Sequence, residues 1–464
     1  MVKKINLKYK PVVGLEVHIE QSTKSKMFCA CSARHFGSKP NSQTCPVCLG
    51  LPGAMPYAND KAIENTVKLG FAFGSEIARK SKFDRKHYFY PDLPKGYQIS
   101  QYDEPLCHNG NFQFSRRPGG QAISNFQRRI RVRRIHLEED TAKLIHTKVD
   151  GEAVSLIDFN RSGVPLIELV TEPDFEDAQS VIDFLKEVQL IARYLEISDA
   201  DMEKGSMRLE ANVSLIQVKG KGQGVKELPD YKVELKNINS FRFLKKAINF
   251  EIERQNKLLK SGKRVTQETR GFDETGARTF SQRTKEEAQD YRYFPEPDLP
   301  EIRLSNGRLS QIKKTLPELP GLMRERFKKA YSLTSAYTDI LVSDRARARY
   351  FEEALRSADG KLDITPQQLA GLIINQSFDK RFPEPAGLVR KVIELERRDR
   401  APAGETREVI EEVIGANKKA IADYKKGKSQ VTGYLMGQVQ KRLSGRGDIK
   451  LIQKELLSKL RQFS

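Results

Sequence analysis

An alternating stretch near the start of the chain constrains the fold more than any other feature. From Val13 to Ile19 apolar residues recur at every second position, and this period of two predicts a half-buried strand. Successive side chains of a strand point to opposite faces, so three apolar residues face the core: Leu15, Val17 and Ile19. The opposite face carries three polar residues: Glu16, His18 and Glu20. This face is either a row of metal ligands or a solvated surface, and for a strand taken alone the solvated surface is commoner.

Three further predicted strands repeat the pattern, at 128–139, 207–215 and 231–236. Their polar faces carry His136, Glu138, Glu210 and Glu234, and Glu139 closes the first of these strands. Arg133-Arg134 breaks the alternation of that first strand, which we interpret as a bulge. If the four strands belong to one sheet, their polar side chains form a cluster rich in carboxylate oxygens. Such clusters select Mg²⁺ or Mn²⁺.

Positive side chains accompany the acidic ones. Arg208, Lys236 and Arg292 supply the positive charge that a transferring phosphoryl group requires. The sequence lacks a Walker A motif, because Gly427-Lys428-Ser429 has Ala422 where the first glycine should stand. The glycine-rich segment 219–224 is predicted to be a hairpin connection rather than a phosphate loop. ATP binding would therefore need a site built from carboxylates on a sheet.

Four of the five cysteines are clustered, and they are Cys29, Cys31, Cys45 and Cys48. Two short thiol pairs separated by a loop fit a structural, tetrahedral Zn²⁺ site. Reduced thiols without a metal are the alternative, and disulfides are the weaker explanation because nothing marks the chain as secreted. His35 is an alternative ligand, and we interpret Cys107 as a small buried residue.

The remaining patterns are mostly helical. Amphipathic periodicity predicts helices at 60–80, 177–195 and 241–259. Residues 82–98 combine basic, aromatic, proline and glycine residues, and form either a rigid loop that binds an anionic, planar ligand or a packed surface loop. After a proline-rich boundary at 291–300, seven more helices are predicted: 322–333, 344–357, 366–376, 385–397, 405–425, 428–443 and 448–461.

These elements predict an α+β chain of three domains. Residues 1–300 form an antiparallel-sheet domain that includes the cysteine cluster at 29–48, residues 301–403 form a linker and helical domain, and residues 404–464 form a small helical tail. The tail has 13 Lys/Arg and 7 Asp/Glu, a net charge of +6 (13 − 7). It suits binding of an RNA backbone, or else it is a bundle with an ordinary solvated exterior.

Overall charge narrows the class of partner. The 464-residue chain has a formal net charge of +20, which favours a polyanionic partner, with nucleic acid first. The alternative is a soluble protein that is merely basic. The sequence has no long uncharged apolar run and no signal or transit pattern at its N-terminus, so we expect a cytoplasmic protein without a membrane partner.

Several motifs, in order along nearly the whole chain, resemble the GatB/GatE family of tRNA-dependent amidotransferase subunits. They are Val13–His18, Cys45–Gly53, Lys82–Gln101, His136–Asp140, Gly163–Asp174, Glu234–Phe241 and Asp290–Pro295, with a YqeY-like tail at Asp423–Lys428 and Gly433–Gly437. The resemblance implies a cradle domain of glutamine-synthetase-like fold, then an all-α domain and a YqeY-like helical tail.

The resemblance also implies a reaction. ATP phosphorylates the side-chain carboxylate of glutamyl-tRNA(Gln), and ammonia from a glutaminase partner displaces the phosphate to give glutaminyl-tRNA(Gln). The same enzymes also act on aspartyl-tRNA(Asn). This chain would carry the kinase and transamidation site in a heterotrimer, together with an amidase (the A subunit), which makes ammonia, and a small C subunit.

Transferred residue by residue, the resemblance implies that Mg²⁺ is bound by Glu16, His18, Glu138 or Glu139, Glu210 and Glu234. Among these, Glu16, His18, Glu138 and Glu234 are the expected catalytic residues, and Arg208, Lys236 and Arg292 the expected ATP-binding residues. Two positions depart from the family, because relatives often carry Asp at Glu210 and Glu at Lys204. The four cysteines match only those members of the family that bind zinc.

Two other functions are alternatives to that of an amidotransferase subunit. They are a zinc-stabilised, non-catalytic tRNA-binding scaffold and a free-standing ligase.

Overall fold

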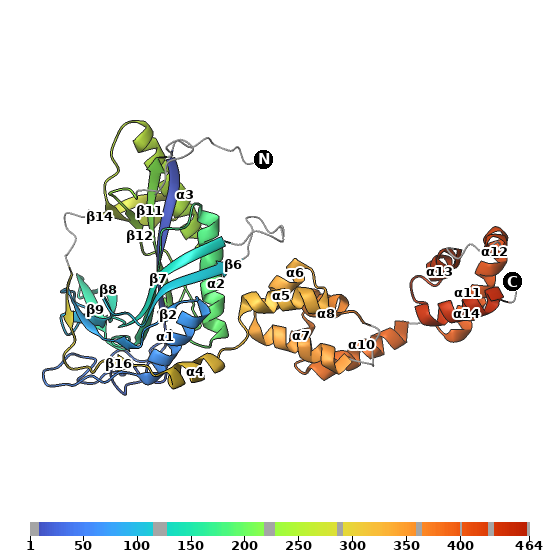
Figure 1. The fold of residues 1–464 in the computed structure, drawn as a ribbon, viewed down its shortest axis with the longest axis horizontal. Coiled ribbons are helices and arrows are strands. Elements are labelled where there is room, and N and C mark those ends of the chain that lie inside the picture. The colour runs from blue at the N-terminus through green and yellow to red at the C-terminus, as the bar shows by residue number, and fades with distance from the viewer. Residues whose placement is uncertain are drawn as a thin grey trace. The chain divides into compact units, whose positions relative to one another are not determined.

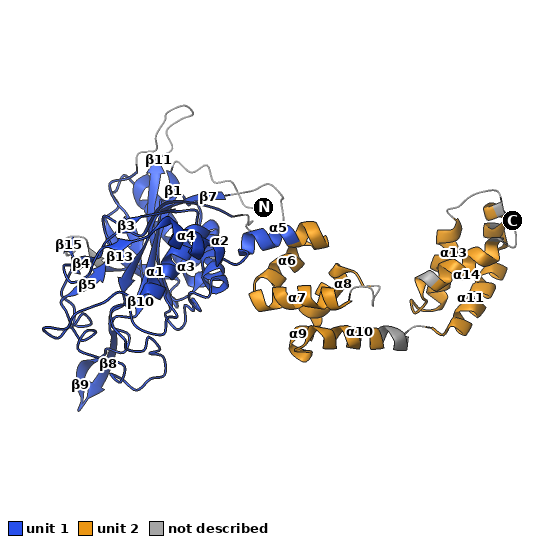
Figure 2. Cartoon of the chain, turned by 60° about the horizontal axis from the view of Figure 1, so that its bottom comes forward, with its two compact units in different colours: residues 1–326 blue, residues 327–464 orange. Residues whose placement is uncertain are grey.

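The computed structural model describes residues 9–114, 128–217, 228–284, 291–358, 364–399, 401–425 and 431–461. The predicted connection at 219–224 lies outside these ranges. The chain divides into two compact units, residues 1–326 and 327–464, which we describe separately (Figure 2). Among the described helices, none is both long and apolar enough to cross a membrane.

A nine-stranded sheet organises the first unit (Figure 1), in the order β14-β13-β12-β11-β1-β10-β7-β6-β2. Its strands are β1 (Tyr9–Glu20), β2 (Glu76–Ile77), β6 (Cys107–Phe114), β7 (Arg128–Glu139), β10 (Pro165–Thr171), β11 (Met207–Gln217), β12 (Val233–Leu235), β13 (Glu268–Asp273) and β14 (Arg278–Thr284). Neighbours are antiparallel except β12 and β13, which are parallel. The four strands that the alternation predicted therefore belong to one sheet.

Three helices cover one face of this sheet (Figure 1): α1 (Asp60–Ala72), α2 (Ala178–Tyr194) and α3 (Phe241–Lys260). Leu15, Val17 and Ile19 are at most 1% exposed within the core beneath them, as the alternation predicted. The polar side chains of β1 consequently lie on the opposite face. The predicted bulge in β7 is also confirmed, because its pairing with β10 skips Arg133.

Smaller sheets flank the large one. They are β15-β4-β5, with β4 (Asp84–His87), β5 (Tyr97–Ser100) and β15 (Arg292–Pro295); β3-β16, with β3 (Lys80–Ser81) and β16 (Ile302–Arg303); and the hairpin β8 (Lys143–Val149) with β9 (Glu152–Asp158).

Two predictions for residues 60–98 were wrong. The helix predicted at 60–80 ends at Ala72, because Gly74 adopts a positive φ of 64° beyond its C-terminus. The loop predicted at 82–98 contains β4 and the start of β5, because its backbone pairs with the distant strand β15.

Helices make up the rest of the chain. α4 (Asn306–Lys314) belongs to the first unit, and α5 (Pro320–Tyr331) runs across the division. The second unit contains α6 (Ser335–Val342), α7 (Arg345–Ala358), α8 (Pro366–Gln376), α9 (Phe378–Arg381), α10 (Pro385–Asp399), α11 (Ala403–Ala416), α12 (Lys418–Lys425), α13 (Val431–Arg442) and α14 (Ile449–Arg461). The predicted helices are confirmed, except that 405–425 divides at Asn417, whose side-chain amide donates to the Val413 carbonyl. The sequence did not predict α4, α6 and α9.

The last four helices enclose a core of their own, which includes Ile410, Val413, Leu435 and Leu456. Several basic residues of this tail are exposed, including Lys418, Lys441, Arg442 and Arg446. Arg442 and Arg446 each pair with a nearby glutamate, at 3.1 Å and 3.0 Å. The side chains of Lys419 and Lys425, together with Lys426 and Lys428, lie outside the described parts of the chain.

Candidate functional site

A cavity of about 730 Å³ lies on the face of the sheet that α1, α2 and α3 leave uncovered. Seven of the predicted site residues border it: Glu16, His18, Glu138, Arg208, Glu210, Glu234 and Lys236. They come from β1, β7 and β11 and from β12 with the residue after it. The sheet brings them together because β1 lies between β10 and β11, and β7 lies beyond β10.

One group of side chains in the cavity has the geometry of a metal site. His18, Glu138 and Glu168 each offer one ligand atom, and these atoms lie within 4.8 Å of one another. His18 Nε2 is 3.5 Å from Glu138 Oε1 and 3.8 Å from Glu168 Oε2. His136 Nε2 lies 3.2 Å from Glu168 Oε2 and so orients that carboxylate. Two carboxylates and one imidazole suit Mg²⁺ or Mn²⁺, with the remaining positions available to water or phosphate oxygens.

The electrostatics of this group favour a bound cation. Burial raises the pKa of Glu138 to about 8, and the negative charge of Glu168 contributes to this rise. Burial also lowers the pKa of His18 to about 4, so its imidazole is neutral at physiological pH. A neutral imidazole retains a lone pair for a metal, and a divalent cation would offset the repulsion between the two carboxylates.

Glu168 was not predicted from the sequence to be a site residue. It belongs to β10, whose residues are all buried, so that strand shows no alternation of apolar and polar residues. One signal could have revealed it, because Glu168 is the single charged residue in the apolar run 164–170. A charge buried in a strand needs a partner or a metal.

A second acidic group in the same cavity is organised around a lysine. Lys236 Nζ lies 3.1 Å from Glu210 Oε2 and 3.0 Å from Glu234 Oε1. Thr269 Oγ1 donates to Glu234 Oε2 at 2.9 Å. Burial raises the pKa of Glu210 to about 8 despite the nearby ammonium, and a hydrogen bond with Glu234 contributes to this rise.

Glu16 joins this second group, because Glu16 is directly opposite Glu210 in the β1–β11 ladder and accepts a hydrogen bond from Asn212 Nδ2 at 3.0 Å. The six predicted metal ligands therefore do not form a single cluster. His18 and Glu138 lie with Glu168, whereas Glu16, Glu210 and Glu234 lie around or beside Lys236.

The other predicted residues differ in their surroundings. Arg208 borders the cavity and donates two hydrogen bonds to Asp140, at 2.9 Å and 3.0 Å. Burial opposes ionisation of Asp140, yet Arg208 and Arg161 lower its pKa to about 2. Glu139 does not border the cavity, because its carboxylate pairs with Lys95 and accepts from the Ile99 backbone.

Arg292, predicted to bind ATP, is exposed on β15 and is not among the described residues that border the cavity. Its neighbours Tyr291 and Tyr293 border the cavity instead, because alternate residues of a strand face opposite sides. Tyr293 stacks on Tyr102, with ring centroids 4.1 Å apart. Aromatic and basic residues of the 82–98 segment, including Lys86 and Tyr88, thus reach the cavity.

The cysteine cluster forms a separate candidate metal site. The Sγ atoms of its four residues, Cys29, Cys31, Cys45 and Cys48, all lie within 4.8 Å of one another, and all four thiols are free. The fully buried Lys26 places Nζ 3.5 Å from Cys48 Sγ. A hydrogen bond from Cys29 is the main cause that lowers the pKa of Cys48 to about 4, well below the usual range of a thiol.

His35 does not belong to this cluster, because its Nε2 lies 2.7 Å from Glu20 Oε1. The carboxylate of Glu20 is held by this contact with His35, and Glu20 does not border the cavity. Cys107 is fully buried in the core, as the sequence analysis expected.

The cysteine loop packs closely against the residues that precede β5. Gly50 adopts a φ of 66°, and a Cβ added there would lie 2.5 Å from Lys95 Cγ. Lys95 pairs with Glu139, the neighbour of Glu138. Glycine at position 50 therefore lets the cysteine loop approach Lys95 closely.

Comparison with known proteins defines the class. A family model described as the GatB/GatE catalytic domain matches residues 11–310, and a second, described as a GatB domain, matches residues 360–460. The chain therefore belongs to the GatB/GatE family, as its motifs indicated.

Individual relatives match nearly the whole chain. The B subunit of the aspartyl/glutamyl-tRNA(Asn/Gln) amidotransferase of Thermomicrobium roseum is 42% identical over 98% of this chain and 99% of its own length. The proteins of the same name from Persephonella marina and Caldanaerobacter subterraneus are 41% and 42% identical, over 97% and 98% of this chain and 99% and 100% of their own lengths.

Proposed function

We propose that this chain is the subunit of a tRNA-dependent amidotransferase that activates the side-chain carboxylate of a misacylated tRNA. In the proposed reaction, ATP phosphorylates the carboxylate of Glu-tRNA(Gln) or Asp-tRNA(Asn), and ammonia then displaces phosphate to give the amide. The observation that carries this proposal is the cluster of His18, Glu138 and Glu168 in a cavity also bordered by Lys236 and Arg208. The names of the full-length relatives support the choice of substrate.

The residues of the cluster fit Mg²⁺. The imidazole of His18 and the carboxylates of Glu138 and Glu168 would hold the ion, and His136 orients Glu168. When bound, Mg²⁺ would offset the charge on the phosphate oxygens during phosphoryl transfer. The neutral state of His18 and the size of the cavity are consistent with this role.

Lys236 and Arg208 supply the remaining positive charge. The carboxylates of Glu210 and Glu234 hold the ammonium of Lys236 at the cavity wall, and Asp140 holds the guanidinium of Arg208. Fixed cations of this kind stabilise a developing phosphate charge without reorganising during the reaction. We therefore propose that Glu210 and Glu234 position Lys236, in place of the metal ligation predicted from the sequence.

The family also guides the proposed architecture and partners. We propose that residues 1–300 form the glutamine-synthetase-like cradle, that residues 301–403 form the helical domain, and that residues 404–464 form a YqeY-like tail that binds tRNA. The exposed basic residues of the tail support the last assignment. An amidase partner, the A subunit, would supply ammonia, and a small C subunit would complete a cytoplasmic heterotrimer.

We propose that the four cysteines bind one structural Zn²⁺. The spacing of their sulfur atoms and the lowered pKa of Cys48 support zinc over free thiols. The ammonium of Lys26 would offset part of the negative charge that four thiolates bring to the ion.

The test is an assay of the purified heterotrimer with glutamyl-tRNA(Gln) and aspartyl-tRNA(Asn), each with and without ATP. We expect ATP-dependent amide formation on at least one of them. Glu16→Ala, Glu138→Gln and Glu234→Ala should abolish amide formation and leave glutamine hydrolysis intact, whereas the exposed control Glu274→Ala should retain both. Normal amide formation by the three cavity variants would contradict the proposal.

The second candidate is a non-catalytic, zinc-stabilised tRNA-binding scaffold. It accounts for the net charge and the cysteines but gives no role to the buried carboxylates. A heterotrimer that binds tRNA yet forms no amide under any condition would favour it.

A further inference from the structure

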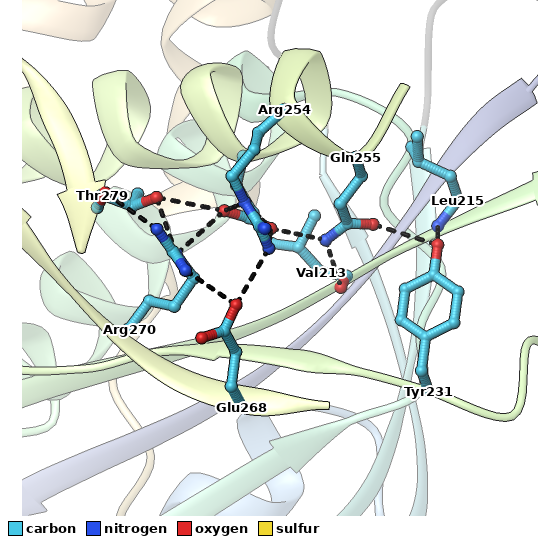
Figure 3. A network of polar contacts seen from close by, with 9 residues as sticks. Val213, Leu215, Tyr231, Arg254, Gln255, Glu268, Arg270 and Thr279 are labelled. Carbon is cyan, nitrogen blue, oxygen red and sulfur yellow. Dashed lines mark hydrogen bonds and ion pairs between the residues drawn. The ribbon is translucent and has the colours of Figure 1, made fainter. Parts of the chain in front are cut away.

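A buried polar network joins α3 to the strands β11, β13 and β14 (Figure 3). Its centre is Glu251 of α3, which is fully buried. Glu251 accepts hydrogen bonds from Arg254, Gln255 and Thr279, at 2.7 Å, 2.9 Å and 3.2 Å, and lies 3.5 Å from Arg270 Nε. A fully buried carboxylate with four polar partners is expensive to build, so it calls for an explanation beyond packing.

The network reaches the strands that carry the second acidic group. Arg270 of β13 donates to Glu268 at 2.7 Å and to the Thr279 carbonyl of β14 at 2.9 Å. Gln255 donates to the Val213 carbonyl of β11 and accepts from the Tyr231 hydroxyl. Two carboxylates and two guanidinium groups balance in charge, so the network adds rigidity without leaving a net buried charge.

The backbone alone fixes β13 weakly against β12. β12 is three residues long, and it pairs with β13 through two residue pairs, Glu234 with Thr269 and Leu235 with Arg270. One further backbone bond runs from the Lys236 amide to the Arg270 carbonyl at 3.1 Å. So short a ladder specifies register poorly, and a slip of one residue would exchange the two faces of the strand.

Successive residues of β13 connect the two sides of the sheet. Thr269 faces the cavity and donates to Glu234 Oε2, while Arg270 faces α3 and contacts Glu251. With one oxygen of Glu234 held by Thr269, the other lies 3.0 Å from Lys236 Nζ. Fixing Arg270 therefore fixes Thr269, and Thr269 fixes the carboxylate that holds Lys236.

We propose that Arg270 and Glu251 are positioning residues, which set the register of β13 and thereby orient Glu234 and Lys236 for phosphoryl transfer. This inference rests on the proposed function, because it assigns a task to the same cavity. Neither residue is placed to contact the reacting groups. Their effect is on the placement of the ammonium, where an error of about 1 Å can reduce the rate about a hundredfold.

The experiment uses the assembled heterotrimer and compares Arg270→Lys, Thr269→Val and the double variant. Arg270→Lys retains the charge but loses the forked contacts to Glu268 and Thr279. We expect each single variant to lower kcat for ATP-dependent amide formation by about tenfold, with KM for aminoacyl-tRNA unchanged. Because Arg270 and Thr269 both act through Glu234, the kcat of the double variant should be no lower than that of the more impaired single variant.

The matched control is Arg278→Met, an exposed arginine on the same β13–β14 hairpin that contacts Asp273. It should retain full activity, and glutamine hydrolysis should be normal in every variant. The inference is overturned if Arg270→Lys keeps the wild-type kcat. It is also overturned if the factors by which kcat falls in the two single variants multiply in the double variant, because that result would mean that the two residues act independently. Failure of the wild-type heterotrimer to form amide would instead contradict the proposed function.

Discussion

Glu210 offers a sharp test of the electrostatics of the cavity, through the variant Glu210→Gln. Burial is the main cause that raises the pKa of this carboxyl from 4.5 to about 8, so it is protonated in the folded chain at neutral pH. Glutamine has the shape of a protonated glutamate, and its amide can donate to Glu234 as the carboxyl does. The variant therefore retains the contacts but removes the titration.

The magnitude follows from linkage. Below pH 4.5 the carboxyl is protonated in both the folded and the unfolded chain, and its stabilising contribution is fully present. As the pH rises toward 8, only the unfolded chain releases the proton, and each pH unit costs the folded state about 1.36 kcal/mol. From pH 4.5 to pH 7 the loss amounts to about 3 kcal/mol, and glutamine should restore up to that amount.

The assay is denaturant unfolding of the full chain in EDTA, at pH 5 and pH 7.5, followed for the sheet-containing unit. Glu210→Gln should be nearly as stable as the wild type at pH 5 and clearly more stable at pH 7.5. A stability difference that does not change with pH, or a variant less stable at pH 7.5, would refute the reasoning.

Four further predictions concern other parts of the molecule. Glu168→Gln should weaken Mg²⁺ binding by about tenfold or more in calorimetric titration, because one of three clustered ligands loses its charge. Cys45→Ser should leave the purified chain without stoichiometric zinc by metal analysis, and an unchanged zinc content would contradict the cysteine site. Gly70→Ala should destabilise the chain by about 1–3 kcal/mol in denaturant titration, since its Cβ would lie 2.5 Å from a buried sulfur, whereas Gly437→Ala, with open space around it, should not. Removal of residues 404–464 should weaken tRNA binding in filter assays, and unchanged affinity would refute the role of the tail.

Local alternation was enough to predict much of the sheet. The strands β1, β7 and β11 each have one apolar and one polar face, and their residues Glu16, His18 and Glu138 border the cavity. Alternation of apolar and polar residues is a local property of the sequence, so it can be recognised without knowing which strand the segment pairs with. The same reasoning explains why Leu15 and Val17 were correctly assigned to the core.

Non-local pairing explains what the sequence did not reveal. Glu168 lies on a strand that is buried on both faces, so no alternation marks it. Strand β4 forms because His87 pairs with Arg292, which is far away in the sequence, and nothing in the local pattern predicts that contact. Arg292 was predicted to be a cavity residue from its charge. In the structure its two neighbours, Tyr291 and Tyr293, border the cavity instead.

The division of the acidic residues into two groups has a similar cause. The sequence shows that Glu210, Glu234 and Lys236 share polar faces, but not which of their charges pair. That depends on the β11–β12 register, which sets Asn212 opposite Glu234 and brings Lys236 to both carboxylates. Pairing of charges is a property of three-dimensional placement, and it cannot be read from alternation alone.

The central position of β1 has a consequence for biosynthesis. β1 ends at Glu20, but its two neighbours in the sheet are made much later, since β10 begins at Pro165 and β11 at Met207. At the usual rates of translation the ribosome needs on the order of 10–30 s to reach the first of these partners. During this interval an apolar strand emerges without its neighbours, which makes it a target for chaperones and a hazard for aggregation. The residues that build the cavity can therefore assemble only long after the strand at its centre has left the ribosome.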